Sequence, residues 1–410
     1  MLSPEALGIL GNNAGRSGIM IFVALTIGAL LSLFTIAMIH DPAITKRDSS
    51  LTCLAAVAGL LPAMTLTLAS RLGLALFLPT GMLVTAGFTF NETFVYWFPN
   101  FAFSFLLLAI VLTLHLAGER VALLAQPFFV GLTMSCLVLL CLAGLIGSPE
   151  ETWSTEIQTG NPLSLSLHVV FTALLLFLGY DQPGSALFSG SRVQYIVPLM
   201  AGFILLALWG FVSLKHVPRA KLAASTIPYS ISAREIFGQP GRVIIGVAVI
   251  SGTCGLVNGL FLLAERSLRH MADYISPLPP FRAAYNGRIL PVIFSVCIGI
   301  FMAAGLAGSD KLKIFIYGAL LLWLVQVGTH CFAAASRLHK QQKSCRYRYL
   351  LVAVFPLAVL WLACRGEHAT ALVVFFFLAL AVSAACSAGW VWYEGKRPNK
   401  TIQDSQGDLP

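Results

Sequence analysis

Hydrophobic runs of about twenty residues recur along almost the whole chain, and they constrain its fold more than any other feature. Eleven such runs lie between Ser17 and Tyr393, with short polar stretches between most of them. A helix crosses a bilayer with about 20 apolar residues, and it satisfies its own backbone groups there. Of all residues, 58% are hydrophobic and only 10% are charged, against roughly 25% charged in a soluble domain. We therefore exclude soluble, disordered and fibrous proteins and predict an all-α polytopic membrane protein.

The lengths of the runs predict about eleven transmembrane helices plus a half-helix at the N-terminus. The half-helix covers residues 2–15, which are too few to cross a bilayer. Residues 51–64 are apolar but contain Gly59 and Pro62, and this predicts a short surface helix before the next span. The predicted spans are residues 17–39, 65–90, 99–116, 123–146, 163–188, 195–214, 243–263, 289–306, 314–335, 350–364 and 369–393.

Positive charges predict how the chain is oriented in the membrane. The net charge is +9, but the cations lie in short loops between apolar runs, which indicates a topological role rather than binding to nucleic acid. With the loop of Lys46 and Arg47 placed inside, the inside loops hold sixteen Lys and Arg residues and the outside loops eight. This bias predicts a multi-pass inner (plasma) membrane protein whose C-terminus, with the polar tail 395–410, is cytoplasmic.

One loop opposes this orientation. Residues 215–242 fall outside, yet they hold five of the eight outside cations. Their sequence, which includes Ser-Ile-Ser-Ala-Arg-Glu-Ile-Phe-Gly-Gln-Pro-Gly, predicts a small amphipathic helix folded over the outer face.

The predicted span 163–188 is interrupted by Gly-Tyr-Asp-Gln-Pro-Gly-Ser at residues 179–185. Pro183 lacks an amide hydrogen, and glycines on either side of it weaken the helix. An acid such as Asp181 is costly at the membrane midplane unless it faces water or a partner. Broken helices at this depth line cavities, where their free amide and carbonyl ends bind carboxylates, amines or cations.

We therefore predict a substrate site formed by Gly179, Tyr180, Asp181 and Gln182. Asp181 could also carry a proton, since burial favours the neutral carboxyl group. The alternative is a structural helix that is kinked by its proline and whose acid is paired. Transporters often contain inverted repeats with one broken helix in each half, and residues 2–15 have the length expected of the matching half-helix.

Three stretches of the sequence together match the pattern of one transporter family. They are residues 4–15, Gly179-Tyr180-Asp181, and residues 255–281 with Gly-Leu-Val-Asn-Gly-Leu, Ala-Glu-Arg and Leu-Pro-Pro-Phe in that order. They resemble, respectively, the end of helix 1, the unwound part of helix 6 and the end of helix 8 in the amino acid–polyamine–organocation (APC) superfamily of permeases. The similarity in order and spacing covers most of the chain.

The resemblance implies the leucine-transporter fold, in which ten core helices form two inverted five-helix repeats, here followed by two extra C-terminal helices. A single transporter domain would then cover residues 1–394. Its parts would be repeat one at about 1–147, repeat two at about 163–335, and the extra helices at about 347–394.

The resemblance also implies a secondary transporter, a symporter or antiporter, that moves an amino acid or related organic amine by alternating access. Its partners would be this small molecule, H⁺ or Na⁺, and the lipid bilayer. Thr133 and Ser135 stand in the fifth helix, which lacks the lysine of some proton-coupled relatives, and they are candidates for ion coupling. Asn258, in the eighth helix, is predicted either to line the cavity or to bond a neighbouring helix.

The chain departs from the family in its first helix, because the family's Gly-Ser/Thr-Gly break would lie before residue 1. We expect either a start codon that is placed too late or a degenerate, partner-dependent relative. Two other classes stay open: a membrane-embedded enzyme acting on lipid-linked substrates, and a non-transporting sensor or subunit with the permease fold. The sequence contains no catalytic, metal-binding or cofactor motif, so we predict no catalytic residue, no metal site and no cofactor. The oligomeric state stays open.

Other polar residues each allow two interpretations. Asn91 and Glu92 lie among aromatic residues, which is typical of an interfacial belt but also fits an outer gate. His115 and His168 fit structural roles or a proton relay. Arg71 is expected to extend to the cytoplasmic interface, because long cationic side chains can snorkel.

Overall fold

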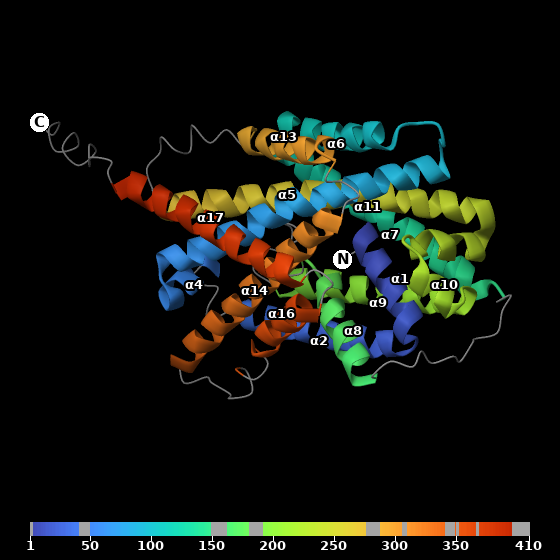
Figure 1. Cartoon of the computed structure of the whole chain (residues 1–410), viewed down its shortest axis with the longest axis horizontal. Helices are drawn as coiled ribbons and strands as arrows, with labels where there is room; N and C mark the ends of the chain where they lie inside the picture. Colours follow the sequence, from blue (N-terminus) through green and yellow to red (C-terminus); the bar gives the residue numbers. More distant parts are fainter. Residues whose placement is uncertain are drawn as a thin grey trace, which may run out of the picture.

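The computed structural model describes residues 3–40, 50–148, 162–179, 192–275, 288–305, 310–340, 349, 352–365 and 369–395. Within these ranges the regular elements are all helices (Figure 1). They are α1 (Pro4–Ser17), α2 (Met20–Ile39), α4 (Ser50–Ala58), α5 (Leu60–Thr93), α6 (Asn100–Ala117), α7 (Glu119–Ile146), α8 (Pro162–Leu176), α9 (Val193–His216), α10 (Arg219–Ala224), α11 (Pro228–Ile275), α13 (Ile289–Ala303), α14 (Asp310–Lys340), α16 (Val354–Arg365) and α17 (Ala369–Gly395).

The helices confirm the predicted membrane spans. Among the described residues, eight helices are long and apolar enough to cross a membrane, and three shorter apolar stretches lie in α8, α13 and α16. Each of these coincides with one of the eleven predicted spans. The predicted half-helix is α1, which is too short to span.

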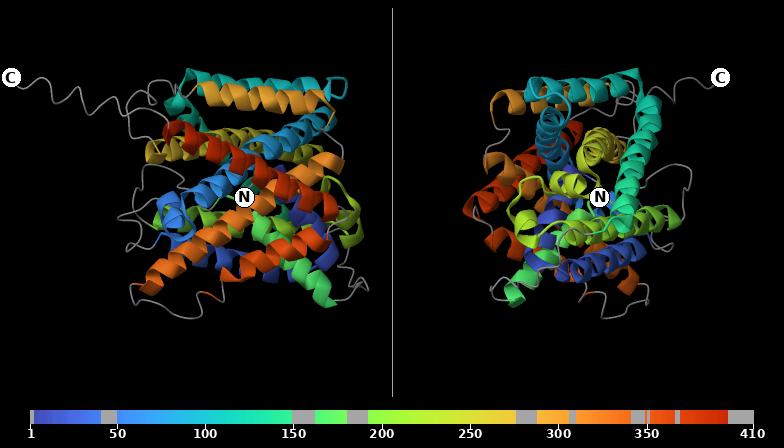
Figure 2. Two further views of the ribbon diagram at one scale, coloured as in Figure 1. Left: turned by 60° about the vertical axis from the view of Figure 1, so that its left-hand side comes forward. Right: turned by 90° about the vertical axis from the view of Figure 1, so that its right-hand side faces the viewer.

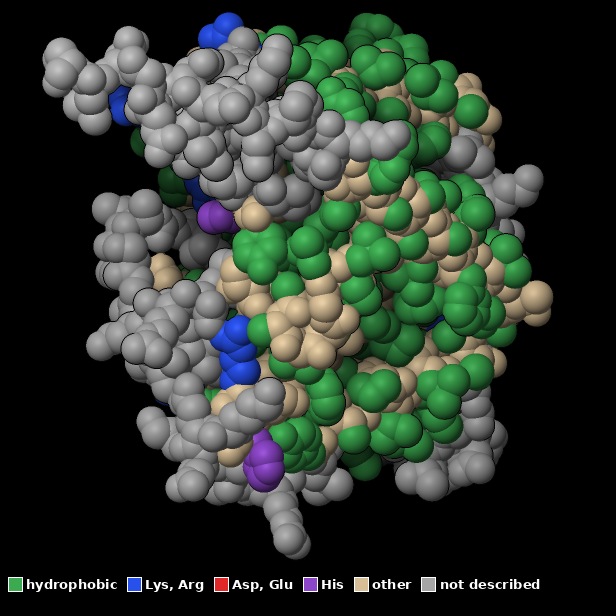
Figure 3. Space-filling model, turned by 90° about the vertical axis from the view of Figure 1, so that its left-hand side faces the viewer, with side chains coloured by type: hydrophobic (Ala, Val, Ile, Leu, Met, Phe, Trp, Pro, Cys, Tyr) green, Lys and Arg blue, Asp and Glu red, His purple; other side chains and the backbone are tan. Residues whose placement is uncertain are grey.

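Helices α5, α11 and α14 form the interior of the molecule, and α1 lies near its middle (Figures 1 and 2). Helices α6 and α13 lie side by side at one edge, and α17 crosses α5 and α14. The surface is apolar: hydrophobic side chains dominate the described part of the face in Figure 3. Large apolar residues such as Leu124, Phe128 and Phe377 are exposed, as expected of a surface in contact with lipid.

Two glycines with positive φ set helix boundaries, and one of these differs from the prediction, since residues 60–64 belong to α5 and not to the short helix predicted at residues 51–64. Gly59 has a φ of +88° and separates α4 from α5, and Pro62 lies in the first turn of α5, where its missing amide hydrogen costs nothing. Gly238, with a φ of +62°, kinks α11 near its beginning. The helix predicted within residues 215–242 is therefore the part of α11 before this kink.

Three of the five cations in residues 215–242, Lys215, Arg219 and Arg242, bind carbonyl groups at helix ends, which gives a structural reason for their position. Lys215 donates to the carbonyl oxygens of Gly144, Leu145 and Gly147 at 3.1, 2.9 and 2.7 Å, so it caps the C-terminus of α7. A cation at this end of a helix also interacts favourably with the helix dipole. The other contacts are Arg219 with the carbonyls of Gly15 and Arg16, Lys221 with Glu235, and Arg242 with the carbonyl of Glu92.

The expectation for Arg71 is wrong. Only 5% of this residue is exposed, because it lies on the buried side of α5. Nearby on α5, Gly73 lies against Ala319, and this contact packs α5 closely on α14. The arginine therefore stays in the interior and does not reach an interface.

Candidate functional site

Helix α8 stops in the middle of the predicted span. Its last helical residue is Leu176, and Gly179 follows after a turn with a φ of +92°. L-amino acids rarely adopt this left-handed conformation, so a regular helix cannot continue through it. The interruption that the sequence predicted therefore begins here. Tyr180, Asp181 and Gln182 lie outside the described residues.

The short helix α1 lies directly beside α8. Ser3 caps its N-terminus, since the serine hydroxyl accepts a hydrogen bond from the amide of Ala6 at 3.2 Å. Asn13 of α1 donates to the hydroxyl of Thr172 in α8 at 2.9 Å, and both side chains are buried. A buried polar pair of this kind fixes two helices against each other. The structure thus brings together the two half-helices that the sequence singled out.

Helix α2 holds the end of α8 from the other side. Gly28 of α2 lies so close to Phe177 that a Cβ atom at this glycine would stand 2.9 Å from the phenylalanine ring. Phe177 is fully buried. The backbone just before Gly179 is therefore anchored, which keeps the break at a fixed position.

Glu5 is the charged residue of this region that the sequence analysis missed. It lies in the first turn of α1 and is only partly buried. An acid in the first turn of a helix is ordinary, because it complements the helix dipole, so no sequence signal set Glu5 apart.

Asn258 bonds a neighbouring helix. Its side-chain nitrogen donates to the carbonyl of Ala122 at 2.9 Å and to Oε1 of Gln126 at 2.8 Å, both on α7. It is fully buried. Gly259, the next residue on the same helix, leaves room for Gln126, because a Cβ atom there would stand 3.3 Å from the glutamine nitrogen. Of the two interpretations, the structure supports the helix–helix bond.

The two candidates for ion coupling do not come together. Thr133 is buried, and its hydroxyl lies 2.8 Å from that of Ser251 in α11. Ser135 is exposed. Residues two positions apart on a helix point in different directions, so only Thr133 faces the interior.

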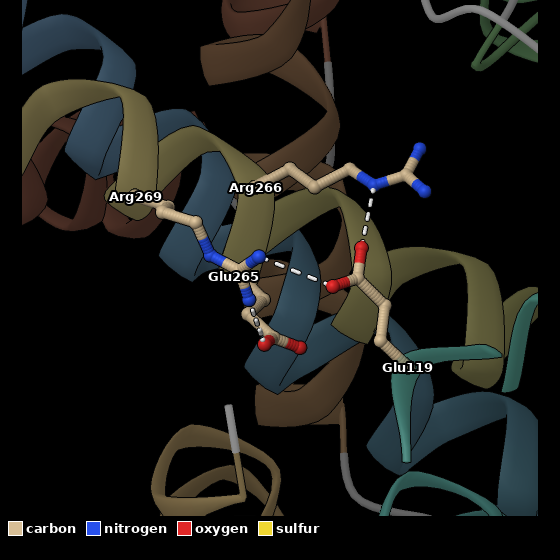
Figure 4. A network of polar contacts seen from close by, with 4 residues as sticks. All are labelled: Glu119, Glu265, Arg266 and Arg269. Atoms are coloured by element: carbon tan, nitrogen blue, oxygen red, sulfur yellow. Dashed lines mark hydrogen bonds and ion pairs between the residues drawn. The ribbon is translucent and has the colours of Figure 1, made fainter. Parts of the chain in front are cut away.

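An ion-pair network joins the beginning of α7 to the end of α11 (Figure 4). The carboxylate of Glu119 lies 3.5 Å from Nε of Arg266 and 3.1 Å from a terminal nitrogen of Arg269. Arg269 also pairs with Glu265 at 2.7 Å. The side chain of Glu265 is only 3% exposed, so this carboxylate depends on its arginine partner.

These contacts form a regular series that we call the polar seam. On α7 its members are Glu119, Gln126 and Thr133, and they face Glu265, Asn258 and Ser251 of α11 through the contacts described above, with Arg269 joining the two acids. Successive members on each helix are seven residues apart. Two antiparallel helices that meet every seven residues keep the same faces in contact along their length.

The remaining polar candidates have structural surroundings. The side chain of Asn91 donates to the carbonyl of Phe98 at 2.8 Å, which closes the turn between α5 and α6. Tyr96 and Trp97 in this turn are 88% and 79% exposed, as in an interfacial aromatic belt. The ring of His115 packs 5.5 Å from that of Phe261. Among the described residues, no group of three or more His, Cys, Asp and Glu residues could hold a metal ion.

Comparison with known proteins shows that the chain shares its fold with membrane transporters. One match is a manganese transporter of Eremococcus coleocola, solved with an aromatic bis-isothiourea substituted compound. Its TM-score is 0.54 and its sequence identity 14%, and the match covers 96% of this chain and 91% of the transporter chain. Mhp1, a nucleobase-cation-symport-1 family transporter solved in a closed conformation with bromovinylhydantoin, matches with a TM-score of 0.52 and 15% identity, over 98% of this chain and 92% of its own.

No protein-family model matches the chain, and no curated protein matches it in sequence. The structural likeness confirms the predicted leucine-transporter-like fold. Both named neighbours are transporters and not enzymes. The narrower resemblance to the APC permeases stays a prediction.

Proposed function

We propose that the chain is a secondary transporter of amino acids or related organic amines, working by alternating access in the cytoplasmic membrane with its C-terminus in the cytoplasm. The observation that carries this proposal is the end of α8 at Leu176, followed by the left-handed Gly179, beside the short helix α1. Interrupted helices in the interior of a membrane protein are tolerated where they line a cavity. In transporters of this architecture they hold the substrate.

The substrate site is the segment Gly179–Ser185, which follows the end of α8 in the sequence and includes Tyr180, Asp181 and Gln182. The last carbonyl groups of α8 carry partial negative charge. Together with the carboxylate of Asp181, they form a suitable environment for an ammonium group. The named neighbours bind different small molecules, so the proposal for this substrate rests on the charges of the segment and not on the shared fold.

Ion coupling involves Asp181 or Thr133. Asp181 would carry a proton, and Thr133, buried beside Ser251, would contribute to a sodium site. Thr133→Val should then abolish stimulation of uptake by sodium, while Ser135→Ala, at the exposed position, serves as the matched control. For the proton alternative, uptake by Asp181→Asn should lose the pH dependence of the wild type. Identical pH profiles for the two proteins would rule out the proton-carrying role.

The first test is thermal unfolding of the detergent-purified chain with a panel of amino acids and polyamines, with and without sodium. A ligand at a hundredfold excess over its Kd stabilises the folded state by about 2.7 kcal/mol. We expect a shift for one class of compound that disappears in Asp181→Asn. Uptake of that compound into proteoliposomes then tests transport directly. Binding without uptake would instead indicate a sensor or a subunit.

A further inference from the structure

Arg266 is only partly used by the ion-pair network at the ends of α7 and α11. Its Nε atom lies 3.5 Å from one carboxylate oxygen of Glu119, and Arg269 takes the other oxygen at 3.1 Å. Figure 4 shows the two terminal nitrogens of Arg266 directed away from these partners. Among the described residues, no hydrogen bond or ion pair engages them, and 40% of the side chain is exposed. Arg266 therefore presents its terminal N–H donors to the surroundings of the protein.

A second arginine lies beside this network at the beginning of α7. Arg120 directly follows Glu119, which contacts Arg266, and it is exposed. Within the ranges that the structure describes, its side chain has no hydrogen-bond or ion-pair partner either. Both arginines have long stems, so their guanidinium groups can reach a common ligand from two helices. With Arg269 and Glu265 included, the cluster holds three arginines and two glutamates, so its net charge is +1.

The two arginines lie at the edge of the apolar part of their helices. The predicted spans begin at residue 123 in α7 and end at residue 263 in α11. Arg120 and Arg266 are each three residues outside these limits, which is about 4.5 Å along the helix axis. Lipid headgroups occupy this level of a bilayer. The charge bias of the loops predicts that this is the cytoplasmic side of the membrane.

An apolar surface continues from Arg120 along α7. Leu124 and Phe128 follow it at intervals of four residues, so they occupy successive turns on one side of the helix. They are 75% and 65% exposed. Only 28% of the most apolar stretch of α7 is buried, which leaves this side of the helix open to hydrocarbon. A ligand that fits the whole surface therefore has an anionic head at the arginines and an apolar chain below them.

We propose that Arg120 and Arg266 bind the phosphate of an anionic phospholipid, with one of its acyl chains on Leu124 and Phe128. The planar guanidinium fork matches two oxygens of a phosphate, and the single negative charge of a phosphodiester balances the net charge of the cluster. A soluble phosphate would gain the charge contact without the apolar one. The inference goes beyond the proposed function and does not depend on transport, because it concerns a lipid that joins α7 to α11.

The test measures lipid binding to the full chain in detergent by native mass spectrometry. The two probes are dioleoylphosphatidylglycerol, which is anionic, and dioleoylphosphatidylcholine, which has the same acyl chains and no net charge. We expect the wild type to bind the anionic lipid about tenfold more tightly, since cationic side chains near the membrane surface attract anionic lipids. In Arg120→Gln/Arg266→Gln this preference should disappear, and each single substitution should lower it a few-fold.

Two further variants separate the guanidinium fork from charge alone and from general effects of substitution. Arg120→Lys/Arg266→Lys keeps both charges without the fork and should retain part of the preference. Arg234→Gln removes an exposed arginine at the opposite end of α11. It is the matched control and should bind both lipids as the wild type does.

Three results would overturn the inference. They are equal affinity of the wild type for the two lipids, an unchanged preference in an Arg120→Gln/Arg266→Gln protein that unfolds at the wild-type temperature, and displacement of the bound lipid by inorganic phosphate at the same concentration. The last result would identify a site for soluble anions. If the double glutamine variant fails to fold, the single substitutions decide, and an unchanged preference in both contradicts the site. Uptake plays no part in these measurements, so a failure of the proposed transport function leaves their outcome unaffected.

Discussion

Asn13 of α1 donates a hydrogen bond of 2.9 Å to the hydroxyl of Thr172 in α8, although the two residues are 159 positions apart in the sequence. This bond joins α1, which corresponds to the predicted half-helix, to α8, which ends just before the predicted break. It links the position of α1, which carries Glu5, to the position of the break at Gly179. Any substrate held between these elements is therefore held by two helices that are fixed to each other.

Breaking this bond should destabilise the protein and weaken substrate binding. Asn13→Ala leaves the Thr172 hydroxyl with its bonds to its own helix, so we expect a loss of about 0.5–1.5 kcal/mol in the free energy of unfolding. A double-mutant cycle with Thr172→Val, measured by reversible unfolding in mixed micelles, should give a coupling energy in the same range. Strictly additive losses would show that the bond does not stabilise the fold.

Substitution of Gly179 should act through the backbone alone. A Cβ atom at this position would meet nothing within 4 Å, but its φ of +92° is unfavourable for L-residues. We expect Gly179→Ala to cost about 1–2 kcal/mol and Gly179→Asn to cost less, since asparagine tolerates left-handed conformations better. Gly131→Ala is the control, because Gly131 also has open surroundings but lies within α7. Alanine there should be neutral or stabilising by up to about 1 kcal/mol, as measured in the same unfolding assay.

Substitution of Lys215 should lower the stability of the fold and leave the orientation of the chain in the membrane unchanged. Lys215→Met removes three hydrogen bonds to the end of α7 but also removes a cation from a loop that is predicted to lie outside. The melting temperature should fall, and a C-terminal reporter fusion should keep its cytoplasmic location. Lys215→Arg should recover part of the stability. A protein that inverts its orientation, or that melts at the wild-type temperature, would contradict this account of the loop.

Substitution of the acid should destabilise the protein to different extents in two ion pairs, because the two acids differ in exposure. Glu265 is 3% exposed and pairs with Arg269 at 2.7 Å, whereas Glu235 is 33% exposed and pairs with Lys221, also at 2.7 Å. Glu265→Gln should destabilise by about 1–3 kcal/mol, since a charge-assisted hydrogen bond at a buried carboxylate is lost. Glu235→Gln should cost less than about 1 kcal/mol, and 1 M salt should remove most of that cost. Unfolding at low and high salt checks both, and equal losses would contradict the assigned exposures.

The spans and the interruption near Gly179 could be predicted from the sequence because they depend on local properties. Length and apolarity define a membrane helix, and the glycine and proline residues that stop a helix lie within the segment that they interrupt. The different orientations of Thr133 and Ser135 could also be predicted, since residues two positions apart on a helix point in different directions.

The contacts of the candidate site could not be predicted in this way, because their partners are distant in the chain. Asn258 bonds Gln126, which lies 132 positions away, and no local pattern pairs the two. Arg71 lies within a long apolar helix, and only the packing of other helices on α5 determines that it is buried. Glu5 has the sequence appearance of an ordinary first-turn acid.

The regular spacing of the polar seam limits how α7 and α11 can move. If one helix slid along the other by a single turn, Gln126 and Asn258 would each face apolar positions. Arg269, which stays paired with Glu265 on its own helix, would lose its contact with Glu119. The seam contacts that cross between the two helices would be lost together, because they share one interval. In the proposed transport mechanism, α7 and α11 therefore move together as one rigid body, and the rearrangement that opens each side of the membrane in turn involves the elements outside this pair, among them α1 and α8.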